Sequence, residues 1–149
     1  MPGEAFNWMI RLKAIEREYR MVRLSMDRLE QQAQDDPHVL PEGLRFRDID
    51  AVSGHLEGTY LVRLFSEFET ALRHFLRAQR LRQPTKAEPL INKVRDRVNI
   101  STDHTGSVHK VRVYRNTLVH DIDEDAVPVM IREATSYLST FLSWLQRTW

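Results

Sequence analysis

Apolar residues recur along most of this chain at spacings of three and four, which is the period of an amphipathic helix. The first such stretch predicts a helix from Ala5 to Gln34. It ends at Asp35-Asp36-Pro37, because the residue before a proline resists the helical conformation. One apolar seam is sustained over three heptads of this helix, at Trp8, Leu12, Ile15, Tyr19, Val22, Met26 and Leu29.

The second predicted helix carries two apolar stripes rather than one. It is expected to follow a loop over residues 37–52, with Ser53 as its N-cap, and to end near Arg82. Gly58 weakens the helix locally but permits a close helix crossing. Two stripes indicate a helix packed on two sides, in a bundle interior or in a dimer. The main stripe is Leu61, Phe65, Phe68, Leu72 and Phe75, and the flanking stripe is Leu64, Ala71 and Ala78.

Three shorter helices complete the predicted fold. They are expected over Ala87–Val98, over Thr105–His120, and after an acidic linker at 121–125, with Pro128 in the first turn of the last helix. The last helix again shows two apolar faces, one of them at Met130, Tyr137 and Trp144. Residues 1–149 therefore predict one all-α domain, a five-helix bundle of up-and-down type.

The amino-acid composition excludes some classes of protein and of metal site. The chain has 149 residues, 42% of them hydrophobic and 29% charged, and no cysteine, so it predicts neither disulfides nor a thiolate metal site. His104 and His109 match no zinc spacing, and we expect no metal and no cofactor. No signal peptide or apolar run of membrane-spanning length is visible, which favours a cytoplasmic protein without a membrane partner.

Charge is distributed unevenly, although the net charge is only +1. Residues 73–115 contain eleven Lys or Arg and three acids, whereas residues 1–72 and 121–149 are both net acidic. A basic middle region favours a polyanionic partner such as RNA, provided that its side chains share one surface. The residues predicted as weak RNA contacts are Arg73, Arg77, Lys110 and Arg112.

Polar residues interrupt the apolar stripe at the end of the fourth predicted helix. Asn116 and His120 are one turn apart and share a face, and Arg115 lies next to Asn116. Histidine titrates near neutral pH and can act as acid or base, while arginine offers a planar, permanently charged fork for a phosphate. The candidate roles are His120 as general acid or base, Arg115 as phosphate clamp and Asn116 as positioning group.

The stretch from Tyr114 to Asp121 resembles the signature of the HEPN superfamily (higher eukaryotes and prokaryotes nucleotide-binding domains), in which an Arg precedes a His by a few residues. Here the motif is Arg115-Asn116, three residues, then His120, at the end of the penultimate helix. The resemblance implies a helical bundle that cleaves RNA without a metal, as a homodimer with a composite site. It also implies a role as a toxin or defence effector.

One position departs from that resemblance. In HEPN toxins that pair with a nucleotidyltransferase antitoxin, a modifiable tyrosine follows two residues after the His, where this chain has Ile122. That mode of neutralisation is therefore in doubt, and a different antitoxin protein, or none, is equally compatible with the sequence.

Two other interpretations of the motif stay open. In a purely structural one, Arg115 pairs with a bundle carboxylate such as Glu67, and His120 interacts with the C-terminal end of its helix. In a non-catalytic one, the chain binds RNA or nucleotide, or acts as a helical interaction module, without cleaving anything.

Overall fold

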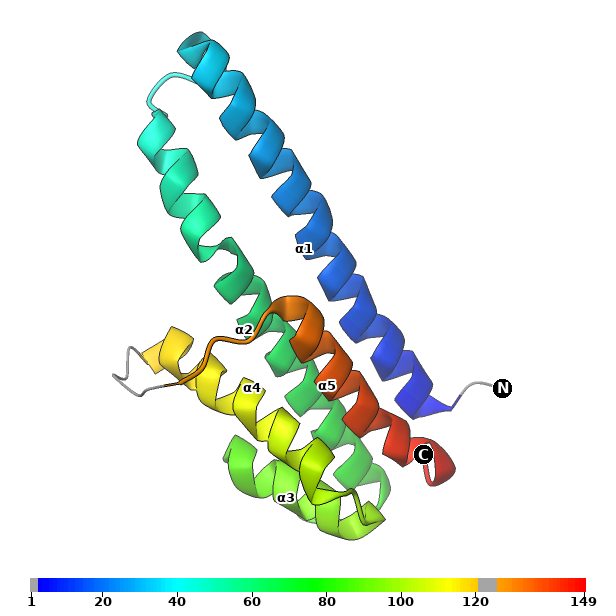
Figure 1. Ribbon diagram of the computed structural model, residues 1–149. Coiled ribbons are helices and arrows are strands. Elements are labelled where there is room, and N and C mark those ends of the chain that lie inside the picture. Colours follow the sequence, from blue (N-terminus) through cyan, green and yellow to red (C-terminus); the bar gives the residue numbers. More distant parts are fainter. Residues whose placement is uncertain (1–2, 121–125) are drawn as a thin grey trace.

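The computed structural model describes residues 3–120 and 126–149, and this part of the chain contains helices but no strand. The predicted acidic linker at 121–125, with Ile122, lies outside the described residues. Five helices in one compact unit confirm the predicted all-α class (Figure 1). Their bounds are Glu4–Asp35 (α1), Phe46–Ala78 (α2), Ala87–Val98 (α3), Thr102–His120 (α4) and Ile131–Ser143 (α5), with 3-10 turns at Pro37–Val39 (η1) and Trp144–Arg147 (η2).

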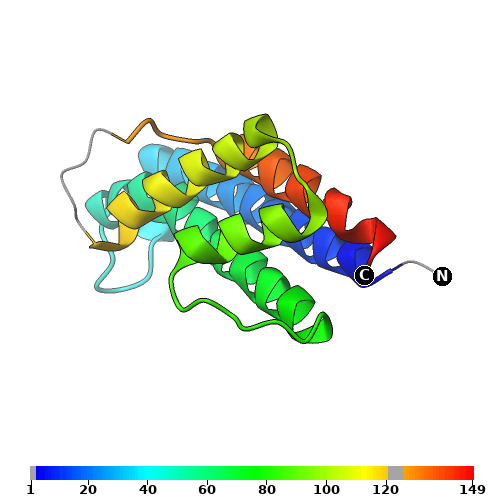
Figure 2. The same ribbon diagram turned by 90° about the horizontal axis from the view of Figure 1, so that it is seen from below.

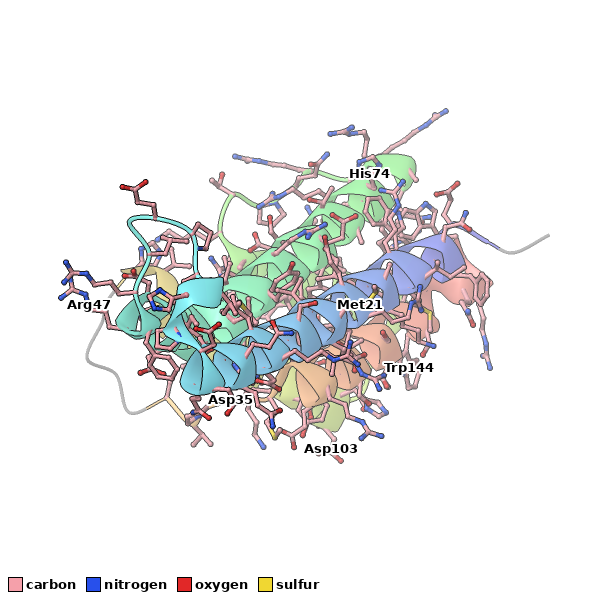
Figure 3. The ribbon with its side chains drawn as sticks, turned by 90° about the horizontal axis from the view of Figure 1, so that it is seen from above. Met21, Asp35, Arg47, His74, Asp103 and Trp144 are labelled. Atoms are coloured by element: carbon pink, nitrogen blue, oxygen red, sulfur yellow. The ribbon has the colours of Figure 1, made fainter. Side chains whose placement is uncertain are left out.

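α1 and α2 form a long antiparallel hairpin that extends beyond the other helices (Figure 1). Asp35 and Arg47 mark its tip at one end of the molecule (Figure 3). The seam predicted for α1 is buried only from Trp8 to Ile15, because α1 meets α5 there, while toward the tip it faces only α2 and η1. Met21, on the outer side of α1, is 71% exposed (Figure 3).

Four helices close a ring in which α1 packs on α2, α2 on α4, α4 on α5 and α5 on α1. α3 lies outside this ring, across α2 and α4 (Figure 2). The α2/α4 seam, covered by α3, and the α1/α5 seam are therefore opposite one another in the ring. Helix α5 also reaches α2 across the middle.

The core of the ring is built on α2, whose two predicted stripes are both used inside the single chain. Leu64 and Ala71 of the flanking stripe are as fully buried as the main stripe, and only Ala78 at the end of α2 is exposed. The flanking stripe of α2 is thus explained by packing within one chain. Fully buried large side chains at the centre of the core include Phe65, Phe68, Phe75, Leu72, Leu138 and Phe141.

The start of α2 differs from the prediction of a loop up to residue 52 and a cap at Ser53. The helix begins seven residues earlier, at Phe46, where the Asp48 carboxylate accepts a hydrogen bond from the Arg45 backbone N–H at 2.8 Å. Ile49 and Leu56 are buried one heptad apart and continue the helix period toward the hairpin tip. Ser53 lies inside the helix rather than at its end.

α2 ends at Ala78, four residues before the predicted end near Arg82. Arg80 adopts a left-handed conformation with φ of 56°, and the Leu81 backbone N–H donates to the Leu76 carbonyl at 2.8 Å. This closing pattern is the common way in which a helix ends at a left-handed residue, although glycine is usually found there.

The starts of α4 and α5 also differ from the predicted starts. α4 begins at Thr102, three residues before the predicted Thr105, because the Ser101 side chain caps it by accepting from the His104 N–H at 3.3 Å. α5 begins at Ile131, so Pro128 precedes the helix instead of lying in its first turn.

Glu57 joins three helices at the point where α5 begins. Its Oε1 accepts a hydrogen bond from the Ile131 backbone N–H at 2.9 Å, which places a carboxylate at the positive end of α5. Its Oε2 accepts from the Tyr19 hydroxyl of α1 at 3.1 Å. Burial, and then the nearby Glu57 carboxylate, raise the pKa of the Tyr19 phenol.

Candidate functional site

The end of α4 carries the motif residues into a cleft of about 400 Å³ between α2, α3 and α4. Arg112, Asn116 and His120 follow at intervals of four and therefore lie on one side of α4. Arg115 lines the same cleft, as do residues 86–89 at the start of α3. The structure thus brings together the three predicted catalytic residues, Arg115, Asn116 and His120, with one predicted RNA contact, Arg112.

The Arg115 guanidinium is held in a fixed orientation. Its Nη2 donates to Glu69 Oε1 at 3.0 Å, and its Cζ lies 4.7 Å from the centroid of the Phe65 ring. The side chain is 18% exposed. Its Nε is buried without a partner, and its Nη1 makes no hydrogen bond to any described residue, so Nη1 is the arm of the fork available to an anion.

The predicted pairing of Arg115 with Glu67 is wrong. Glu67 instead faces α1, where its Oε1 lies 3.5 Å from Arg11 Nη1. Glu69 follows Phe65 by one helical turn and therefore comes to the side of α2 on which Arg115 rests. Glu69 also lies 3.7 Å from Arg73, which gives this carboxylate a second cationic neighbour.

A chain of contacts that the sequence analysis missed positions Arg112. Its Nε donates to His109 Nδ1 at 3.0 Å, and His109 Nε2 lies 2.9 Å from Asn92 Oδ1 of α3. This pattern requires a neutral imidazole that accepts at Nδ1 and donates at Nε2. Burial, and then the positive charge of Arg112, lower the pKa of His109. The spacing of three between His109 and Arg112 is the signal in the sequence, but Asn92 could be found only from the fold.

The start of α3 adds a second source of positive potential to the cleft. Ala87 and Glu88 are its first residues, so their backbone N–H groups have no partner within the helix. Helix N-termini favour bound anions for this reason. The Glu88 carboxylate, 3.7 Å from Arg112 Nη2, partly offsets that charge.

Residues 73–115 do not form one basic surface at this cleft. Arg73 donates to the carbonyls of Pro84 and Thr85 at 2.6 and 2.9 Å, so it holds the connection between α2 and α3. Lys110 and Arg77 are exposed but do not line the cleft. Of the four residues predicted as weak RNA contacts, only Arg112 lies beside the motif.

In residues 3–120 and 126–149, no group of three His, Cys, Asp or Glu side chains is placed to hold a metal ion. His109 is engaged with Asn92 and Arg112, and the His104 ring packs against Trp144 with 6.0 Å between the centroids.

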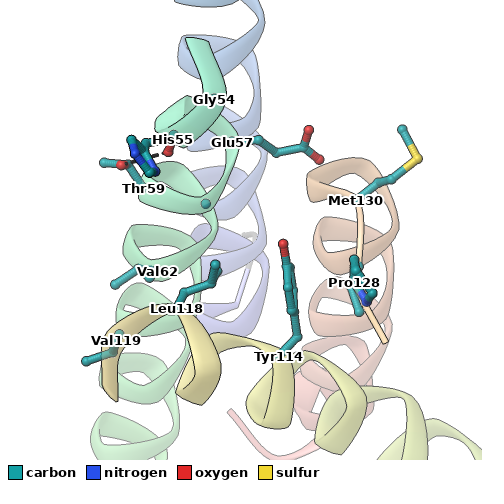
Figure 4. A pocket seen from close by; sticks show the side chains of 12 residues that line it. Gly54, His55, Glu57, Thr59, Val62, Tyr114, Leu118, Val119, Pro128 and Met130 are labelled. Atoms are coloured by element: carbon teal, nitrogen blue, oxygen red, sulfur yellow. Dashed lines mark hydrogen bonds between the residues drawn. The ribbon is translucent and has the colours of Figure 1, made fainter. Parts of the chain in front are cut away.

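A larger, more apolar pocket of about 680 Å³ lies on the other side of the end of α4. Tyr114 and Leu118 point into it from α4, with Met130 at its edge (Figure 4). Leu118 also approaches Gly58 of α2 so closely that a Cβ at that glycine would lie 3.3 Å from a Leu118 methyl carbon. The predicted close crossing at Gly58 is therefore present, between α2 and α4. Leu118 and the neighbouring Val119 are 40% and 47% exposed.

In comparisons with known proteins, no family model, curated protein or solved structure matches the chain. Among the helices that the structure describes, none has the length and apolar character needed to cross a lipid bilayer.

Proposed function

We propose that this protein is a metal-independent RNA endonuclease of the HEPN type, acting as a toxin or defence effector in the cytoplasm. The observation that supports the proposal is the cleft at the end of α4, in which Arg115, Asn116 and His120 meet Arg112 and the start of α3. A cleft with two arginines and a helix N-terminus suits a phosphate, and the imidazole supplies a proton-transfer group beside it.

The chemistry uses a nucleophile that RNA already carries. His120 accepts the proton of a ribose 2′-OH, and the 2′-oxygen attacks the adjacent phosphorus. The bond from phosphorus to the 5′-oxygen breaks, and that oxygen leaves with a proton from an acid. The products are a 2′,3′-cyclic phosphate and a 5′-OH. Arg115, fixed by Glu69, stabilises the charge that builds on the phosphoryl oxygens, and Asn116 orients the phosphate or the imidazole.

A homodimer belongs to this proposal because one histidine serves poorly as both base and acid. Leu118 and Val119 expose apolar surface directly before His120 on α4. Pairing two copies through this surface would bring the ends of the two α4 helices together, with each cleft on a different side of its helix from the contact. An antitoxin protein that covers the same surface is a further partner compatible with the proposal.

The deciding experiment is cleavage of a mixed single-stranded RNA in excess EDTA. We expect the wild type to leave 2′,3′-cyclic phosphate ends, and Arg115→Ala and His120→Ala to lose at least about a hundredfold in rate. Arg28→Ala is the control, because it removes an exposed charge outside the cleft.

Folding must be shown equal before the rates are compared. Arg115→Ala should stay folded because Glu69 retains Arg73 as a cationic neighbour at 3.7 Å. A wild type that leaves RNA intact, or motif variants that cut as fast as Arg28→Ala, would rule out the catalytic assignment.

One observation favours a non-catalytic alternative, such as an RNA-binding module, because it gives Arg115 a structural role in place of a catalytic one. The ion pair between Arg115 and Glu69 is formed within the chain and rests on Phe65, as a structural pair would. This alternative is the one to adopt if RNA binds in a salt-sensitive manner without being cut.

A further inference from the structure

A second groove, of about 560 Å³, runs between α1 and α5. Four cationic residues line it, together with one acid, Glu16, and a set of hydroxyl side chains on α5. The cations are Lys13, Arg17 and Arg20 of α1 and Arg132 of α5. They come from the two segments of the sequence that are net acidic, so the charge balance along the chain does not reveal them.

None of these four cations has a carboxylate partner. Elsewhere on α1, Arg11 pairs with Glu67, Arg23 with Asp27 and Glu18 with Arg63. No described carboxylate lies within 4 Å of the four groove cations, Glu16 included. The groove therefore holds an excess of positive charge that the described residues leave uncompensated.

A buried hydroxyl in the same groove also lacks a partner. Ser139 of α5 is 7% exposed, and its Oγ makes no hydrogen bond to any described residue. Thr135, one turn earlier, shows the usual alternative, because its hydroxyl donates to the Ile131 carbonyl at 2.8 Å. A buried polar atom without a partner is rare in folded proteins, but the Ser139 Oγ is itself shielded from the groove, so we assign it no contact with a ligand there.

The spacing of the cations suits a chain of anions better than a single ion. Lys13, Arg17 and Arg20 follow at intervals of four and three along α1, and so extend over about 10 Å on one side of the helix. Arg132 lies on the neighbouring helix and lines the same groove. A line of separate charges along an open groove matches successive phosphates of an extended strand.

We propose that the α1/α5 groove binds the phosphodiester backbone of single-stranded RNA, through Lys13, Arg17, Arg20 and Arg132. The identity of the polyanion as RNA rests on the proposed function. The α1/α5 seam is opposite the α2/α4 seam in the ring, so the groove is a site separate from the cleft at the end of α4. It would hold RNA outside the segment being cut.

The test measures binding of a fluorescently labelled oligouridylate against salt concentration, in a His120→Ala background that prevents cleavage. The groove variant is Arg17→Gln with Arg132→Gln. Each phosphate contact on a single strand contributes about 0.7 to the slope of log affinity against log salt, so the slope should become shallower by about 1.4. Affinity near 0.1 M salt should fall roughly tenfold or more.

The matched control is Arg28→Gln with Arg47→Gln, which has the same net charge as the groove variant. Both residues are exposed, lie outside the groove and have no carboxylate within 4 Å among the described residues. The control should keep the wild-type slope.

Equal slopes for the groove and control variants would overturn the proposal, as would binding of inorganic phosphate at the groove with no groove-dependent binding of RNA.

Failure of the groove proposal can be distinguished from failure of the proposed nuclease function. A dinucleotide substrate is too short to reach both sites, so the groove variant, with His120 intact, should cut it at the wild-type rate. If no RNA is cut but the slope still changes, only the nuclease proposal fails.

Discussion

Arg112 and Arg115 reach the same cleft, but different groups hold them. Arg115 is oriented by a carboxylate and an aromatic ring of α2, whereas Arg112 is oriented by a neutral histidine of its own helix. Protonation of His109 would put a hydrogen between its Nδ1 and the Arg112 Nε, two donors that cannot share a bond. The position of Arg112 is thus linked to the charge state of a residue that does not line the cleft.

This link predicts a pH dependence of stability. The folded state lowers the pKa of His109 below its ordinary value of about 6.5, so the unfolded chain takes up the proton first as the pH falls. Stability should therefore decrease as the pH is lowered through about 6.5, and the loss should level off below the folded-state pKa.

The measurement is thermal unfolding between neutral and mildly acidic pH, for the wild type and for His109→Gln. Glutamine cannot be protonated in this range, so the variant should lose less stability on acidification than the wild type does. Parallel curves for the two proteins would show that His109 is not the group responsible.

At the scale of helices, the predicted positions of helix interiors were more accurate than the predicted ends. The ends depend on single capping contacts, such as the Asp48 carboxylate at the start of α2 and the Ser101 hydroxyl at the start of α4. The end of α2 depends instead on Arg80, a non-glycine residue with a left-handed backbone. Such a residue carries a steric cost that glycine would not.

Replacement of Arg80 by glycine should therefore stabilise the protein, by about 0.5–1 kcal/mol in the free energy of unfolding, measured with urea. Arg77→Gly is the control, because it removes the same side chain type inside the last turn of α2 and should destabilise by about 1 kcal/mol. A destabilised Arg80→Gly variant would show that the arginine side chain contributes more than its backbone costs.

At the scale of the whole molecule, one uncovered apolar surface lies at the end of α4, beside the motif. Leu64 and Ala71 of the flanking stripe of α2 are buried in the core, whereas Leu118 and Val119 of α4 are exposed beside the apolar pocket. If the protein pairs with itself, this is the surface at which we expect it to do so.

A charge placed on that surface tests the pairing. Sedimentation equilibrium should show a dimer for the wild type and a monomer for Val119→Glu, since pairing would bury the new carboxylate in an apolar contact. Met21→Glu is the control, because Met21 is also exposed and apolar but lies on the outer side of α1 (Figure 3). A wild-type monomer, or a Val119→Glu dimer, would contradict this interface.

The sequence by itself determined the number of helices, the positions of their interiors and the grouping of the motif. Apolar periodicity is a local property, so α1 and α3 were predicted to within a residue, and Arg115, Asn116 and His120 share a cleft because they lie within two turns of one helix. Whether that cleft cuts RNA is still a prediction.

Only the tertiary structure decided which distant residues meet. It replaced Glu67 with Glu69 as the partner of Arg115, because helix packing, and not proximity in sequence, sets which face of α2 meets α4. It also joined Lys13, Arg17 and Arg20 with Arg132, from two net acidic segments, in one basic groove. Charge summed along a chain says nothing about which side chains share a surface, since that depends on how the helices pack.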